Sequence, residues 1–280
     1  MSVGLPTFNR PEGLERVIQY LLQQEYTNVE IIISDNCSTD LRVQAILQQY
    51  AAQDSRIRYF IQETNIQIEP NFNFVFHQAK GRYFMWIADD DIFPNDFIGQ
   101  CVEYLEAHPD VFLCSGITRY TSGQTFLFEE APLNLHHEDS VSRMFHYFRK
   151  VYKNGVFYGV YRNSIPFENP IQHHAGADWN HIARVALLGK IHTLETLKVI
   201  RSDDGGSSSR HKIAARWKLG PFASLFLETY MAYQVAHNLL NEPILQKKFS
   251  FISRCLLQLR VFVYLNYKFF MNALRKRLKT

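Results

Sequence analysis

The sequence lacks the features that mark secreted and membrane-spanning proteins. Its four cysteines are far apart and show no paired spacing, which argues against a disulfide framework or a zinc site and predicts reduced thiols in the cytosol: Cys37, Cys101, Cys114 and Cys255. The first residues already resemble a strand, so we expect no signal peptide. No stretch reaches the ~20 uninterrupted apolar residues of a spanning helix. The 280 residues, 46% of them hydrophobic, are enough for a large core.

The glycine-rich loops that bind phosphates are also missing. No GxGxxG follows the first predicted strand, where Gly4 stands alone and Pro6 intrudes, and no GxxxxGK occurs anywhere in the chain. Dinucleotide binding and P-loop phosphate transfer are therefore disfavoured.

Acidic residues are absent after Glu242, although the chain continues to residue 280. Nine basic residues lie in that segment: Lys247, Lys248, Arg254, Arg260, Lys268, Arg275, Lys276, Arg277 and Lys279. The whole chain has a net charge of +3, so the part before this segment carries −6. A basic tail indicates a polyanionic partner, a nucleic acid or an anionic membrane surface. No nucleic-acid-binding motif or stacking platform accompanies it, so we expect no nucleic acid.

Strands and helices alternate in the first half, which predicts an α/β fold with a mostly parallel, doubly wound sheet. Apolar runs predict strands at residues 3–6, 29–34, 57–61 and 83–88. Periodic segments predict helices over about 11–24, 39–52 and 71–79, and another after Pro94. The second half is mixed: we expect strands at 112–117, 156–161 and partly at 191–200, helices at 139–152 and 176–188, a flexible loop at 203–209, and mostly helix from about 221.

Three consecutive carboxylates, Asp89, Asp90 and Asp91, follow the apolar strand that ends near residue 88. Adjacent like charges raise one another's pKa values unless a cation neutralises them. A hard divalent ion, Mg2+ or Mn2+, takes oxygen ligands and often shares them with substrate phosphates. The alternative is a solvated turn that caps the next helix, but capping requires one carboxylate and not three.

Two other polar clusters follow predicted strands, at residues 7–10 and 35–40. In a parallel sheet, ligands bind outside the carboxyl ends of the strands, and these clusters share that edge with the three aspartates. One such cluster would be ordinary turn chemistry, because Asn, Asp, Ser and Thr favour loops. Three together predict a binding site.

These segments resemble family 2 of the nucleotide-sugar glycosyltransferases, which have the GT-A fold. The similarity covers roughly residues 2–210 and depends on four segments in a family-like order: residues 5–10 (LPTFNR), 32–40 (IISDNCSTD), 79–91 (AKGRYF running into the three aspartates), and 176–178 (GAD) with 188–191 (LGKI) after it.

The resemblance implies roles for individual residues. It implies that the nucleotide pocket is lined by Pro6, Thr7, Asn9 and Arg10. Asp35 resembles the carboxylate that binds the nucleobase imide, and Asp89 or Asp90 would lie near the ribose. Asp89 and Asp91 correspond to the family's DxD motif, with Asp91 as the direct ligand of a Mn2+ or Mg2+ cofactor. Asp178 resembles the general base on the acceptor side. Its alternative role is that of an acidic first-turn residue that stabilises a helix dipole.

This chemistry needs separate groups. The cation stabilises the charge that develops on the nucleoside diphosphate, and a carboxylate must take the proton of the acceptor hydroxyl. One base with no second carboxylate as nucleophile predicts single displacement with inversion.

The sequence departs from the family pattern in two places. Residues 65–67 (NIQ) lack the glycine of the usual Asn-x-Gly, and residues 201–203 (RSD) have an aspartate where many members have histidine. Asp203, Arg201 and Arg210 are candidate contacts to a cation or the diphosphate, and they can equally be solvated charges. Trp179, with Glu168, His173 and His174, is a candidate acceptor contact.

The final segment, from about residue 249 to 274, mixes apolar residues with Arg and Lys. It is too polar to span a membrane, but the pattern is typical of a helix that lies in a membrane interface. The alternative is a helix that packs on the domain or on a second subunit.

We therefore expect a catalytic domain at residues 1–212, with a donor half to about 110 and an acceptor half at about 111–212, followed by a helical basic extension at 213–280. The predicted activity is metal-dependent transfer of a sugar, from a UDP-sugar, to a hydroxyl of a glycan or lipid-linked saccharide. The predicted location is the cytoplasm, either free in it or peripheral on the cytoplasmic face of the membrane. The alternatives are a sugar-phosphate nucleotidyltransferase and a non-catalytic glycan- or nucleotide-binding scaffold.

Overall fold

The computed structural model describes residues 1–89, 91–203, 210–220, 225–241 and 243–277. The chain forms two compact units, each assembled from several stretches of sequence. Unit 1 contains residues 1–136, 152–165 and 189–203, and unit 2 contains residues 137–151, 166–188 and 204–280. The domain boundary expected at residue 212 stays a prediction.

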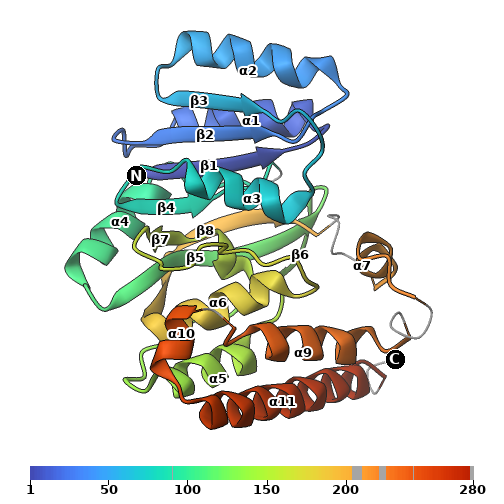
Figure 1. The fold of residues 1–280 in the computed structure, drawn as a ribbon. Helices are drawn as coiled ribbons and strands as arrows, with labels where there is room; N and C mark the ends of the chain where they lie inside the picture. The colour runs from blue at the N-terminus through green and yellow to red at the C-terminus, as the bar shows by residue number, and fades with distance from the viewer. Residues whose placement is uncertain (90, 204–209, 221–224, 242, 278–280) are drawn as a thin grey trace. The chain divides into compact units, whose positions relative to one another are not determined.

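Unit 1 is built on a mixed sheet, in which the described residues supply eight strands. They are β1 (Ser2–Thr7), β2 (Glu30–Asp35), β3 (Ile57–Ile61), β4 (Tyr83–Trp86), β5 (Val111–Ser122), β6 (Thr125–Glu129), β7 (Val160–Arg162) and β8 (Lys190–Ser202). Their order is β3-β2-β1-β4-β7-β5-β6, and β8 pairs with β5 (Figure 1). Strands β1 to β4 are parallel to one another and β8 is parallel to β5, whereas β7 and β6 run antiparallel to their neighbours. The mostly parallel sheet predicted from the sequence is confirmed.

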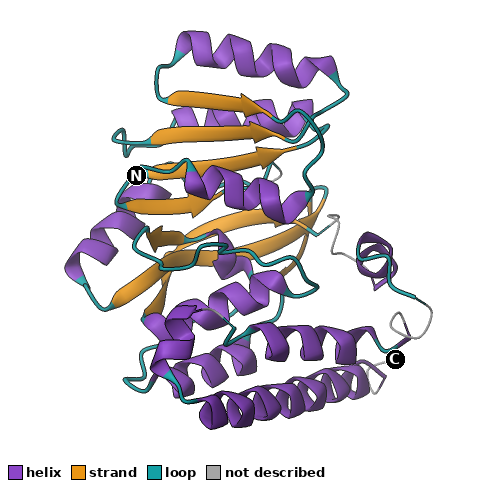
Figure 2. Ribbon diagram, viewed as in Figure 1, coloured by secondary structure: helices purple, strands orange, loops and turns teal. Residues whose placement is uncertain are grey.

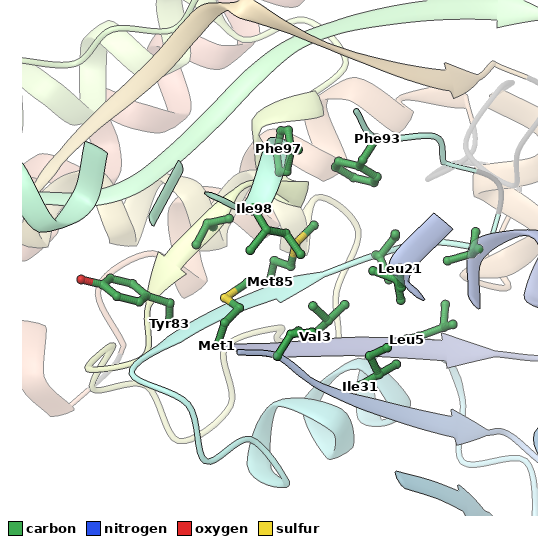
Figure 3. Close-up of a cluster of buried hydrophobic side chains, with 14 of the residues drawn as sticks. Met1, Val3, Leu5, Leu21, Ile31, Tyr83, Met85, Phe93, Phe97 and Ile98 are labelled. Carbon is green, nitrogen blue, oxygen red and sulfur yellow. The ribbon is translucent and has the colours of Figure 1, made fainter. Parts of the chain in front are cut away.

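Helices of unit 1 cover both faces of this sheet (Figure 2). They are α1 (Pro11–Leu22), α2 (Leu41–Gln53), α3 (Ile68–His77) and α4 (Phe97–Ala107). Alternate residues of each strand point to opposite faces. Val3, Ile31 and Met85 therefore join an apolar cluster that includes residues of α1, α2 and α4. Figure 3 shows part of this cluster. Gly4 faces α3, where an added Cβ would lie 2.7 Å from a methyl carbon of Val75, so a larger residue would push α3 off the sheet.

The region expected as a strand at 156–161 has a different structure. It begins with a short 3-10 helix, η1 (Gly155–Tyr158), and only β7 at its end is extended. The carboxylate of Glu130 accepts backbone N–H groups from Lys153, Asn154 and Gly155 at 2.7, 3.1 and 2.8 Å, and Asn154 has φ +65°. These bonds fold the chain into a turn. The short strand β6 was not predicted at all, since its residues are largely exposed and lack an alternating pattern.

A stack of aromatic rings on unit 1 makes stability depend on pH. Tyr104 lies between His108 and His192, with ring centroids 4.0 and 4.1 Å away, and His192 Nδ1 is 3.2 Å from His136 Nε2. Burial lowers the pKa of His192 to about 4, assisted by the charges of His136 and His108. Between pH 6.5 and 4 the unfolded chain therefore binds a proton at this position that the folded chain does not.

We expect the free energy of unfolding to decrease as pH falls from about 6.5 toward 4, because the unfolded state takes up more protons there. Urea unfolding at pH 7 and pH 5 measures this. Replacing His192 with Phe keeps a ring against Tyr104 and removes the titrating group. A variant whose pH dependence equals that of the wild type would contradict the assignment to His192.

Unit 2 is helical in its described residues. Its helices are α5 (Ser140–Lys150), α6 (Ala177–Leu188), α7 (Arg210–Arg216), α9 (Leu227–Asn238), α10 (Pro243–Lys248) and α11 (Phe251–Arg277). Helices α5 and α6 agree with the sequence prediction, and the predicted C-terminal helix is divided into α9, α10 and α11. The loop expected at 203–209 lies, from residue 204, outside the described residues. Within the described part of the chain, we find no helix with the length and apolar character required to traverse a bilayer.

Candidate donor-nucleotide site

The candidate site lies in unit 1, at the carboxyl ends of β1, β2 and β4. Strand β1 lies between the other two, and all three are parallel, so their last residues meet at one edge of the sheet. Thr7 at the end of β1 is in register with Asp35 at the end of β2. The hydroxyl of Thr7 donates to Asp89 Oδ2 at 3.2 Å, which joins the β1 end to the segment after β4. The three polar clusters seen in the sequence are thus contiguous in space.

The side chain of Asp35 is fully buried, and only one of its two carboxylate oxygens accepts hydrogen bonds from described residues. Its Oδ1 accepts the backbone N–H of Ser38 at 3.1 Å and the Ser38 hydroxyl at 2.5 Å. Its Oδ2 is buried and has no hydrogen-bond partner among the described residues. A buried carboxylate oxygen without a donor costs free energy, because its lost hydration is not replaced. Oδ2 is therefore a buried acceptor to which no described residue donates a hydrogen bond.

Asn9 fixes the loop beside Asp35. It has φ +53°, a left-handed conformation that Asn tolerates better than most residues. Its side-chain oxygen accepts backbone N–H groups of Thr39 at 2.8 Å and Asp40 at 3.1 Å, while its own N–H donates to Ser38 Oγ at 2.8 Å. Asn9 therefore connects the β1 and β2 loops, and through Ser38 it orients Asp35.

The aspartates after β4 are paired with arginines. Arg10 Nη1 donates to Asp89 Oδ1 at 2.6 Å, with the Arg10 side chain half exposed. Arg201 Nε, from the end of β8, donates to Asp91 Oδ1 at 2.8 Å, and the Asp91 side chain is fully buried. The sequence predicted a cation to neutralise these carboxylates, and in this structure two guanidinium groups contribute positive charge. Asp90 lies outside the described residues.

Arg201 is held on its other side by a tyrosine ring. Its guanidinium carbon lies 4.0 Å from the ring centroid of Tyr158, which is a cation–π contact. Burial lowers the pKa of Arg201, but the charges of Asp91, Tyr158 and Tyr120 and the hydrogen bond to Asp91 raise it more, so the guanidinium stays charged. A reciprocal pair of backbone hydrogen bonds between Ile92 and Ile200 holds the two chain segments together.

The other residues around this edge are also engaged. Asp203 forms an ion pair with Lys153 at 2.7 Å. Pro6 lies inside β1, fully within the sheet. The side chain of Arg210 lies outside the described residues. Arg201, predicted as a diphosphate contact, has Asp91 as its partner here, and Asp203 has Lys153.

The predicted base, Asp178, lies in unit 2, in the first turn of α6. Gly176, just before the helix, has φ +85°, a conformation that strains other residues. Asn180 is fully buried, and its Nδ2 donates to Gln172 Oε1 at 2.6 Å, while its Oδ1 is buried without a partner among the described residues. The ring of Trp179 packs on Phe269 of α11, and its centroid lies 5.3 Å from Lys268 Nζ.

The donor atoms of the site fit a hard cation. The described residues contain no group of three or more His, Cys, Asp or Glu side chains that would enclose a metal. Mg2+ needs fewer protein ligands, because it is commonly bound by one or two carboxylates plus substrate phosphates. Asp89 and Asp91 provide two such carboxylates at one strand end.

The sequence analysis gave no role to two residues that organise this site, Ser38 and Tyr158. Ser38 orients Asp35, and the three-residue spacing between them is a signal that a side chain caps its own turn. Tyr158, under Arg201, follows a turn set by Glu130, and no local pattern indicates it.

Parallel strands that end in polar groups and carboxylates at one edge are typical of ligand-binding sites in α/β proteins. The chain belongs to glycosyl transferase family 2, whose model matches residues 2–167. The family suggested by the sequence is thereby confirmed.

Three relatives with assigned names are similar over part of the chain. The putative teichuronic acid biosynthesis glycosyltransferase TuaG of Bacillus subtilis is 30% identical over 143 residues, 50% of this chain and 56% of that protein. The putative colanic acid biosynthesis glycosyl transferase WcaA of Escherichia coli is 32% identical over 171 residues, 58% and 57%. The GalNAc(5)-diNAcBac-PP-undecaprenol beta-1,3-glucosyltransferase of Campylobacter jejuni is 37% identical over 93 residues, 32% and 29%. The chain thus matches little more than half the length of the first two and less than a third of the last.

Solved structures share the fold. TarS residues 1–349 of S. aureus, in complex with UDP-GlcNAc, superposes with a TM-score of 0.57 at 20% identity, covering 89% of this chain and 73% of that one. The mannosyltransferase PcManGT of Pyrobaculum calidifontis, in complex with GDP-Man and Mn2+, gives a TM-score of 0.59 at 14% identity, covering 94% and 69%. The fold is that of the GT-A glycosyltransferases, as the sequence predicted.

Proposed function

We propose that this chain transfers a sugar from a UDP-sugar to a hydroxyl of a glycan or lipid-linked saccharide, with a divalent cation and with inversion. The observation that carries the proposal is the buried Oδ2 of Asp35, at the carboxyl end of β2, which has no hydrogen-bond partner among the described residues. The imide N–H of uracil is a donor that fits this acceptor. Cytosine has no N–H at that ring position, so the site favours uracil over cytosine.

The rest of the donor binds along the same edge. Asn9 and Ser38 hold the loop against which the base lies, and Thr7 holds Asp89 beside the ribose position. Asp91, with Asp89, would hold Mn2+ or Mg2+. A bound divalent cation stabilises the negative charge on the departing diphosphate. Arg201 and Arg10 form ion pairs with these carboxylates at the same edge of the sheet, and in this proposal their positive charge also favours binding of the phosphates.

Asp178 acts as the base in this proposal. It accepts the proton of the acceptor hydroxyl while the oxygen forms its bond to the sugar, and the bond from the sugar to the diphosphate breaks. The proton ends on Asp178, and the diphosphate leaves with the electron pair. A single displacement of this kind inverts the configuration at the reacting carbon.

The names of the relatives and the charge of the C-terminal segment support an acceptor class and a location. The Campylobacter jejuni relative is named for an undecaprenol-linked saccharide, and two others are named for teichuronic acid and colanic acid biosynthesis. A lipid-linked or polymeric acceptor at a membrane surface agrees with the basic C-terminal segment, which has no acidic residue after Glu242. We therefore infer that the reaction takes place at the cytoplasmic face of a membrane.

The test is an assay of UDP release from a panel of UDP-sugars, with and without Mn2+, combined with calorimetric titration of UDP. We expect Asp35→Asn to weaken UDP binding by about 10- to 100-fold, because each amide orientation places an N–H against either Ser38 or the base. Asp110→Asn, at the surface ion pair with Lys190, is the matched control and should bind as the wild type does.

The alternatives give different results in this assay. A sugar-phosphate nucleotidyltransferase would release pyrophosphate from UTP and a sugar phosphate, and not UDP from a UDP-sugar. A scaffold would bind UDP with no turnover of any donor. Unchanged UDP affinity in Asp35→Asn would contradict the role given to this carboxylate.

A further inference from the structure

The outward face of α11 is apolar along most of its length. Large apolar side chains recur there every three or four residues, and each is between 41% and 71% exposed: Ile252, Leu256, Leu259, Val263, Tyr267, Phe270 and Leu274. At 100° per residue they fall within a sector of about 80°. We call these seven residues the apolar stripe. Such a contiguous exposed patch marks an interaction surface, whereas scattered single residues would not.

The opposite face of α11 fixes the helix within unit 2. Leu257, Val261 and Leu265 are buried, and α11 packs beside α9 and α5 (Figure 1). Lys268 donates to the carbonyl oxygens of Phe148 and Val151, at the carboxyl end of α5. Burial lowers the pKa of Lys268 to about 8. An ordinary surface helix turns its apolar side inward and its charges outward. In α11 both faces are apolar, and a lysine is on the inner one.

A shallow groove lies along the apolar stripe where α11 meets α5. It has a volume of about 640 Å3, and its lining is mainly apolar: Phe145, Leu259, Arg260, Val263, Tyr264 and Tyr267. The guanidinium carbon of Arg260 is 5.0 Å from the ring centroid of Phe145, so the charge lies at the side of the groove. A groove of this kind suits a hydrocarbon chain whose polar head is anionic.

The charge of the C-terminal segment, counted from the sequence, selects among occupants of the apolar stripe. Every charged side chain of the chain after Glu242 is basic, nine in all. A second copy of the chain on this face would bring two such segments together, and like charges would oppose pairing. A nucleic acid would match the charge but not seven exposed apolar side chains. An anionic phospholipid bilayer matches both, because its phosphates attract Lys and Arg and its acyl layer takes the apolar residues.

We propose that α11 lies in the interface of an anionic phospholipid bilayer, with the apolar stripe among the acyl chains and Arg260 at the phosphates. The groove beside α5 takes up part of one acyl chain. This inference stands on unit 2 alone and does not depend on the proposed glycosyl transfer.

Vesicle flotation of the full chain tests the proposal. We expect the wild type to float with phosphatidylcholine vesicles that contain phosphatidylglycerol, and to remain unbound with phosphatidylcholine alone. The triple variant Leu256→Gln, Val263→Gln, Phe270→Gln changes only exposed positions. It should reduce the bound fraction by at least about tenfold, since partitioning scales with the apolar area that enters the interface.

The control removes apolar surface of similar exposure elsewhere. Phe126 and Leu127 of β6 are 58% and 44% exposed, and the double variant Phe126→Gln, Leu127→Gln should float as the wild type does. Circular dichroism of each variant checks that the helices are intact. Truncation after Pro243 is less informative, because it would uncover the faces of α9 and α5 that α11 covers.

Three results would overturn the proposal. One is a wild type that does not float with anionic vesicles, and another is a triple variant that floats as well as the wild type. The third is a wild-type dimer in light scattering that the triple variant converts to a monomer without any vesicle binding, which would make the apolar stripe a contact between two copies.

Discussion

The Asp178→Asn variant is expected to lower kcat for sugar transfer by about 10²- to 10⁴-fold, the usual contribution of a positioned general base. Asparagine keeps the size of the side chain, but its amide has no basic site that could take the proton of the acceptor hydroxyl. The affinity for UDP should not change, because the proposed role of Asp178 is toward the acceptor hydroxyl, and UDP carries neither the acceptor nor the transferred sugar. Steady-state kinetics with saturating donor and acceptor, together with titration of UDP, measures both quantities.

The competing explanation for Asp178 is a first-turn acid that stabilises the N-terminus of α6. That role is worth about 0.3–1 kcal/mol and does not affect catalysis. Glu12, in the first turn of α1, is a matched control, and Glu12→Gln should show only the small loss of stability. If Asp178→Asn retains kcat and loses stability like Glu12→Gln, the base must be another residue.

The second large effect is on stability. Arg201 and Asp91 form an ion pair whose side chains are 15% and 0% exposed. Removing one partner leaves an uncompensated buried charge, so Arg201→Met and Asp91→Asn are each expected to cost about 3–5 kcal/mol. The double variant Arg201→Met, Asp91→Asn should lose much less than the sum of the two. Urea unfolding of the four proteins measures this coupling.

The pair of Arg10 with Asp89 provides the comparison. The Arg10 side chain is 50% exposed, so Arg10→Met should cost no more than about 1 kcal/mol.

The double variant at positions 91 and 201 has a further use, because it separates folding from catalysis. It should be folded and inactive if Asp91 holds the cation. Additive losses of less than about 1 kcal/mol for the two single variants would show that the pair does not stabilise the fold.

The parallel half of the sheet was predictable because its signals are local. Buried parallel strands form continuous apolar runs, such as residues 31–33, and the helices between them show a helical period. Strand β3 has the bounds that its sequence predicts, and most other boundaries differ by a few residues. The polar clusters at the strand ends were brought together by the general rule for parallel sheets, without knowledge of any contact.

The differences between prediction and structure arise from long-range contacts. The turn at residues 153–155 depends on Glu130, more than twenty residues earlier, and its signal is a single carboxylate in a loop. Arg201 reaches Asp91 across 110 positions of the sequence, so no local pattern associates them. The sequence of α11 predicted a helix that mixes apolar and basic residues. Only the structure distinguishes the residues that pack on α9 and α5 from those that form the apolar stripe.

The most direct measurement is a crystal structure of the chain with UDP and Mn2+. The account predicts uracil at the carboxyl ends of β1 and β2, with its imide N–H donating to Asp35 Oδ2. It also predicts a cation that joins Asp91 to the diphosphate oxygens. A structure in which UDP binds elsewhere, or in which Asp35 Oδ2 stays buried and unpaired beside the bound nucleotide, would contradict it.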